Sequence, residues 1–168
     1  MPSSSTKDNK RITLNPLDTI EEMIAAQEWP YHRLSHDEIL LEIAGRWHDY
    51  RVSFFWNEDS EVLGIISSLE MPVPAERYND TVFLLHLINQ RLGLGHFELS
   101  PEENNLVFRY AYLMAGLKSL KSESFEELLE IVISECERFY PAFQFTVLGN
   151  KKPEEALSVT LLDTQGEA

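Results

Sequence analysis

Three consecutive strand-like segments constrain the fold most strongly. In residues 39–44 and 52–57, apolar positions alternate with a mixed set, and 62–69 is apolar and partly β-branched. A period of two places each set of side chains on its own face of a strand. The turn-like residues 57–60 join the last two segments. We therefore predict three antiparallel strands with one covered face and one wetter face.

Helical patterns precede and follow these strands. Asn15 is expected to cap a helix over 16–27, because its side chain can accept hydrogen bonds from the first helical N–H groups, and Pro16 suits the first turn. A wide apolar stripe predicts a second helix over 75–92, with Gly93 as its C-terminal cap. The width of that stripe indicates burial against more than one surface.

A hairpin and a third helix complete the middle of the chain. Residues 96–99 and 106–113 predict two strands joined by a turn-rich loop. The third helix is expected to begin near Ser124, which has the spacing of a capping box with Glu127. Pro141 either kinks this helix or starts a new one.

The C-terminal segment is less regular. Residues 143–148 alternate in a way that also suits a strand, but the flanking proline and Gly149 favour a helix. Pro153 is expected to open a short last helix that ends before Gly166.

The order helix, three strands, helix, two strands, helices indicates an α+β fold. We expect an antiparallel sheet of about five strands with helices packed on it, and residues 31–34 suit a further short strand. Residues 15–168 are predicted to form a single domain after a flexible polar tail over 1–14.

The charge balance limits the classes of partner. The chain has 14 Lys plus Arg against 28 Asp plus Glu, a formal net charge of −14. Nucleic-acid binding requires a basic surface, and anionic membranes repel acidic proteins, so neither is an expected partner. No apolar run approaches the ~18 residues of a membrane span, and the polar start lacks a secretory signal. We therefore expect a cytoplasmic protein, in which the single Cys136 stays reduced.

No pattern in the sequence carries a catalytic or metal-binding motif. His32 and His36 lie in a predicted extended segment and are interpreted as a surface pair. Gly93 and Gly95 lack the third glycine of a dinucleotide loop and follow a helix instead of preceding one. Cys136 lies on an apolar helix stripe, which predicts an inert core residue. We therefore expect no metal, no cofactor and no enzymatic activity.

Two isolated residues are candidate contacts. Arg109 lies among apolar strand residues and is expected to pair with a carboxylate, for which Glu98 and Asp80 are candidates. Trp47, beside a turn, is either core or part of an exposed recognition patch.

Several stretches, in this order, resemble the YbjN-like family of bacterial sensory-transduction regulators. They are Trp47-His48-x-Tyr50, Trp56, Met71-Pro72-Val73-Pro74, Asn89, Gly95-His96-Phe97-Glu98-Leu99, Phe108-Arg109, Tyr140-Pro141-Ala142-Phe143-Gln144, Glu155-Ala156-Leu157 and Gly166-Glu167-Ala168. The resemblance covers residues 16–168. It implies a fold similar to type III secretion chaperones, which often dimerise, and it supplies no established catalytic residue.

The leading hypothesis is a non-enzymatic, cytoplasmic protein-binding module with a regulatory or chaperone-like role. Trp47, Asn89, His96 and Arg109 are the candidate ligand or partner contacts. The negative charge favours protein or peptide partners with basic segments. Two alternatives remain: a small-molecule sensor or enzyme with a pocket near His96 and Arg109, and a structural homodimer subunit.

Overall fold

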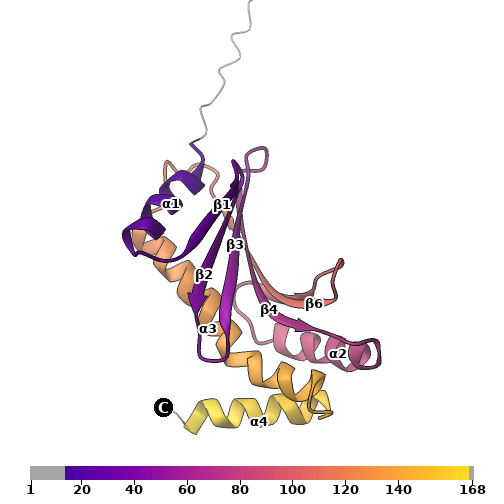
Figure 1. Ribbon diagram of the computed structural model, residues 1–168. Coiled ribbons are helices and arrows are strands. Elements are labelled where there is room, and N and C mark those ends of the chain that lie inside the picture. The colour runs from indigo at the N-terminus through magenta and orange to yellow at the C-terminus, as the bar shows by residue number, and fades with distance from the viewer. Residues whose placement is uncertain (1–13, 167–168) are drawn as a thin grey trace, which may run out of the picture.

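A six-stranded antiparallel sheet forms the centre of the protein, as seen in a computed structural model that describes residues 14–166 (Figure 1). The strand order is β1-β2-β3-β4-β6-β5, and every neighbouring pair is antiparallel. Apart from Leu14, the tail predicted over 1–14 lies outside the described residues. The strands are β1 Tyr31–Ser35, β2 Glu38–Ala44, β3 Asp49–Asn57, β4 Val62–Pro72, β5 His96–Leu99 and β6 Asn105–Leu113.

Helices cover one face of the sheet and one of its ends. Helices α1 and α3 lie along the same side of the sheet, and α2 and α4 lie together beyond its β4 and β6 end (Figure 1). This arrangement confirms the predicted α+β class. The helical elements are α1 Pro16–Ala26, η1 Ala75–Arg77, α2 Tyr78–Asn89, α3 Ser122–Val147 and α4 Pro153–Gly166.

The predicted number of strands was one too low. The short strand that residues 31–34 suited is present as β1, where His32 lies opposite Leu40 of β2. Its side chains alternate only between half-buried and exposed, so backbone pairing with β2 stabilises it more than burial does. A weak apolar period is the expected signal of such an edge strand.

The core lies between the inner face of the sheet and the helices. Ile39, Phe54 and Ile65 lie opposite one another on β2, β3 and β4 and are fully buried. Phe125 of α3 contacts Phe54 at a ring-centroid distance of 5.7 Å. Because each buried side chain of this size contributes roughly 1.5–3 kcal/mol, this packing sets which face of the sheet the helices cover.

Of the three helix caps predicted from the sequence, one is present in the structure. The Asn15 side chain accepts a hydrogen bond from the N–H of Leu17, as predicted. Helix α2 ends at Asn89 with Gln90 as its C-cap, so Gly93 is not its cap. The capping box predicted at Ser124 was also wrong. Phe125 N–H already donates to the Lys121 carbonyl at 3.0 Å, which places Ser124 inside the helix.

Helix α3 runs through Pro141 without interruption. Residues 143–147 belong to this helix, which confirms the prediction of a helix instead of a strand there. A proline has no N–H to donate to the carbonyl four residues earlier. That carbonyl, of Glu137, instead accepts a hydrogen bond from the Trp47 indole Nε1–H at 3.1 Å. Helix α4 includes Gly166 and so extends beyond the predicted end.

Cys136 is fully buried on α3, and burial raises the pKa of its thiol to about 12. Because the thiolate is the reactive form, we expect the native protein to resist an aromatic disulfide reagent at pH 8. In denaturant, one thiol per chain should react within minutes. A native rate equal to the denatured rate, followed by absorbance, would contradict this placement.

Candidate functional site

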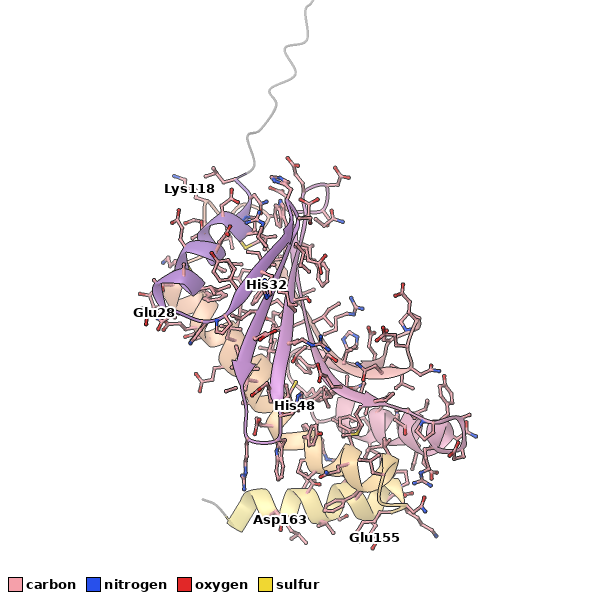
Figure 2. All side chains as sticks on the ribbon, in the orientation of Figure 1. Glu28, His32, His48, Lys118, Glu155 and Asp163 are labelled. Carbon is pink, nitrogen blue, oxygen red and sulfur yellow. The ribbon has the colours of Figure 1, made fainter. Side chains whose placement is uncertain are left out.

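The face of the sheet opposite α1 and α3, here called the outer face, is accessible. A row of directly opposed residues crosses all six strands on this face, and none of them is buried. Directly opposed residues of antiparallel strands share a face. Figure 2 shows His32 at the β1 end of the row. The row is His32, Leu40, Ser53, Ile66, Arg109 and His96.

Apolar residues contribute much of the outer face. Leu34, which follows His32 by two residues at the bulge of β1, is 54% exposed, and Leu113 of β6 is 64% exposed. Between these residues, Phe55 is half-buried and Gly64 lies opposite Ala111. An extended apolar surface of this kind is typical of an interaction site.

An ionic cluster closes the β5 end of the row. The Arg109 Nε–H donates to the Glu98 carboxylate at 2.7 Å, and His96 Nε2 lies 3.2 Å from the other oxygen of Glu98. Partial burial alone would raise the pKa of Glu98, but hydrogen bonds and charge from Arg109 and His96 lower it below the ordinary value. Asp80, the other candidate partner, pairs with Arg77 at 3.1 Å.

Asn89 joins α2 to the edge strand β5. Its amide nitrogen donates to the Phe97 carbonyl and its amide oxygen accepts from the Phe97 N–H, each at 2.9 Å. The side chain thus pairs with Phe97 as the backbone of a neighbouring strand would. Covering an edge in this way protects it from pairing with another chain.

Trp47 packs the hairpin between β2 and β3 against α3. Its ring stacks on Tyr140 at 6.0 Å, and the guanidinium of Arg46 lies 5.0 Å from the ring centroid. Burial, together with the charge of Glu70, raises the pKa of Tyr140. His48 marks the tip of the hairpin in Figure 2, with Asp163 of α4 below it.

Two hollows open on the described surface. The first, here called the end hollow, has a volume of about 630 Å³. The second, of about 500 Å³, lies between the hairpin tip, α3 and α4. The end hollow is lined by Leu14, Asn15, Pro16, Asp18, Thr19, Trp56, Glu61, Met114, Gly116, Leu117, Lys118 and Ser119. The second hollow is lined by Arg46, Trp47, Glu137, Arg138, Pro141, Gln144, Phe145, Thr160, Leu162, Asp163 and Gly166.

The four candidate residues do not form one site. His96 and Arg109 lie opposite each other on the outer face. Asn89 of α2 bonds to the backbone of Phe97 on β5, the strand that carries His96, and Trp47 lies at the distant hairpin tip. Of the four, only Trp47 lines either of the two hollows.

The sequence offered Glu98 only as a candidate partner of Arg109, and the 2.7 Å pair confirms that prediction. The position of Glu98 between Arg109 and His96, at the centre of the ionic cluster, was not predicted. The two-residue spacing from His96 within one strand was the available signal, because it places both side chains on one face. In residues 14–166, no group of three or more His, Cys, Asp or Glu is arranged to hold a metal ion. Within the same range, no helix has the length and apolarity needed to cross a membrane.

Replacing Asn89 with alanine should lower the free energy of unfolding by about 2–3 kcal/mol, because it leaves the N–H and carbonyl of Phe97 unpaired. Chemical denaturation measures the change. Asn79→Ala, at an exposed position of the same helix, should change the free energy by less than about 0.5 kcal/mol. Equal effects of the two variants would contradict the proposed role of Asn89.

Replacing Arg109 with methionine should raise the pKa of Glu98, since it removes a charged donor that stabilises the carboxylate. A carbon-detected NMR titration of the side-chain carboxyl measures the midpoint. Lys118→Met, which removes a cation from a site away from the cluster, should leave that midpoint in place. An unchanged midpoint in Arg109→Met would show that the pair does not persist in solution.

Comparison with known proteins identifies the family. A family model described as YbjN, "Putative bacterial sensory transduction regulator", matches residues 16–145. The crystal structure of YbjN, a putative transcription regulator from E. coli, is similar with a TM-score of 0.50 and 10% identity, over 74% of this chain and 90% of that chain. The crystal structure of the ExsC-ExsE complex gives a TM-score of 0.48 and 12% identity, over 75% of this chain and 94% of that chain. No curated protein matches the sequence. Since the family model spans most of the sequence, from the start of α1 into α3, the chain belongs to the YbjN family.

Proposed function

We propose that this protein is a non-enzymatic regulatory module that binds a protein partner on the outer face of its sheet. The description of the YbjN family as regulators of signal transduction supports the regulatory part. We place this activity in the cytoplasm, where the single cysteine stays reduced.

The observation that carries the proposal is the uncovered row of residues across all six strands. A sheet normally buries one face and exposes a polar one. Here the exposed face presents Leu34 and Leu113, two large apolar side chains. At one edge, Glu98 and Arg109 provide both signs of charge. Exposed apolar side chains beside charged ones are a common composition of a protein interface.

The charge of the chain bears on the kind of partner. With a formal net charge of −14, long-range attraction favours proteins with basic segments and repels acidic ones. Arg109 and His96 can contact a basic partner at the edge of the outer face, because the Glu98 carboxylate that they share offsets positive charge there.

Affinity purification with mass spectrometry from the native host tests the proposal. The wild-type chain should recover a stoichiometric protein, and Leu34→Glu and Leu113→Glu should each lower its recovery about tenfold, as truncation of an interface anchor does. Both positions are exposed, so the variants are expected to fold. Circular dichroism checks that they do.

Leu162→Glu is the matched control, because Leu162 is 66% exposed but lies on α4, away from the outer face. It should recover the partner as the wild type does. Full recovery by both outer-face variants, or an equal loss in the control, would overturn the assignment of the outer face.

A further inference from the structure

We infer that the end hollow receives a bulky apolar side chain of the protein partner, from a segment in which that side chain is flanked by lysine or arginine. This inference rests on the proposed function and names the anchor of the same partner. It is drawn from the shape of the hollow, its position beside the outer face and the charges on its rim.

The hollow has the size and lining of an anchor site. Its volume of about 630 Å³ lies within the roughly 300–1,000 Å³ typical of ligand pockets. Trp56 and Met114, each 6% exposed, form apolar parts of its wall, and Leu14 and Leu117 are 73% and 50% exposed there. A large apolar side chain inserted between them would remove these leucines from water.

The hollow lies on the α1 side of the sheet, at the end of β4 and β6 where the outer face stops. Val62 and Leu113 are opposed residues of the outer face on β4 and β6. The neighbouring residues, Glu61 and Met114, are joined by a hydrogen bond from the Met114 N–H to the Glu61 carbonyl at 2.8 Å, and both line the hollow. A segment lying on the outer face at Leu113 therefore reaches the hollow by crossing this end of the sheet.

The rim of the hollow is acidic. Asp18 and Glu61 line it. Lys118 is the cation of the lining, and Figure 2 shows it where α1 begins. Asp18 is 68% exposed although it pairs with Arg33 at 3.2 Å. A basic segment would gain attraction here, and a second copy of this acidic chain would be repelled.

A peptide titration tests the inference directly. In the full chain with Trp29→Phe and Trp47→Phe, Trp56 is the remaining tryptophan. The probe is a 12-residue peptide with a central phenylalanine flanked by lysines. We expect saturable binding that shifts the emission of Trp56. Replacing the central phenylalanine with alanine, or the lysines with glutamates, should each weaken binding at least about tenfold. Calorimetry on the wild-type chain should give the same Kd.

Substitutions in the protein locate the binding. Leu117→Asp should weaken binding of the lysine peptide about tenfold. Leu148→Asp, at a position 68% exposed at the far end of α3, should leave it unchanged. Lys118→Glu should tighten binding about threefold at low salt, an effect that damage to the fold would not produce.

The outcomes separate this inference from the proposed function. Equal binding of the glutamate and lysine peptides, no effect of Leu117→Asp, or no binding at all would overturn the end hollow as the anchor site. If Leu34→Glu still loses the native partner in that case, the proposed function stands without this anchor. If the peptide binds as expected while Leu34→Glu keeps the partner, the hollow stands and the outer face is wrong.

Discussion

A cluster of phenylalanines joins α3 to the sheet and holds the remaining elements in place. Phe97 of β5 contacts Phe108 of β6 at 5.0 Å, and it contacts Phe139 and Phe143 of α3 at 6.0 and 5.1 Å. Because all four rings are buried, this contact fixes α3 across the β6–β5 side of the sheet. Helix α1 packs on β2 and β3, so every described helix lies on the inner face of the sheet or at its end. The outer face is a consequence of that one-sided packing.

The sequence predicted the elements whose signals are local. Alternation marked β2 and β3, and an apolar, partly β-branched run marked β4. Asn15 marked the start of α1. These patterns act within a few residues. Strand β1 was weakly marked, since its polar side chains are ordered by pairing with β2. The position of β6 between β4 and β5 depends on contacts between distant segments, which no local pattern encodes. The start of α3 was misjudged because Ser124 has capping chemistry at a position that is already helical.

The same limit applies to the candidate site. His96 and Arg109 were identified as unusual residues, but their meeting at Glu98 depends on the register of β5 on β6. The end hollow combines the residues before α1, the β3–β4 hairpin and the loop after β6. Its lining residues carry no shared spacing in the chain, so only the folded structure brings them together. Trp56 is both buried and a wall of that hollow.

Pro141 and Trp47 depend on each other in a way that concerns the evolution of the chain. The proline leaves the Glu137 carbonyl without a helical donor, and the indole of a distant hairpin supplies one. If residue 141 carried an N–H, that N–H would compete for the Glu137 carbonyl, and the hairpin would lose its hydrogen bond to α3. Loss of the indole would instead leave the helix with an unsatisfied carbonyl. Relatives that keep one of these two residues are therefore expected to keep the other, and those that lose one to hold this hairpin by different means.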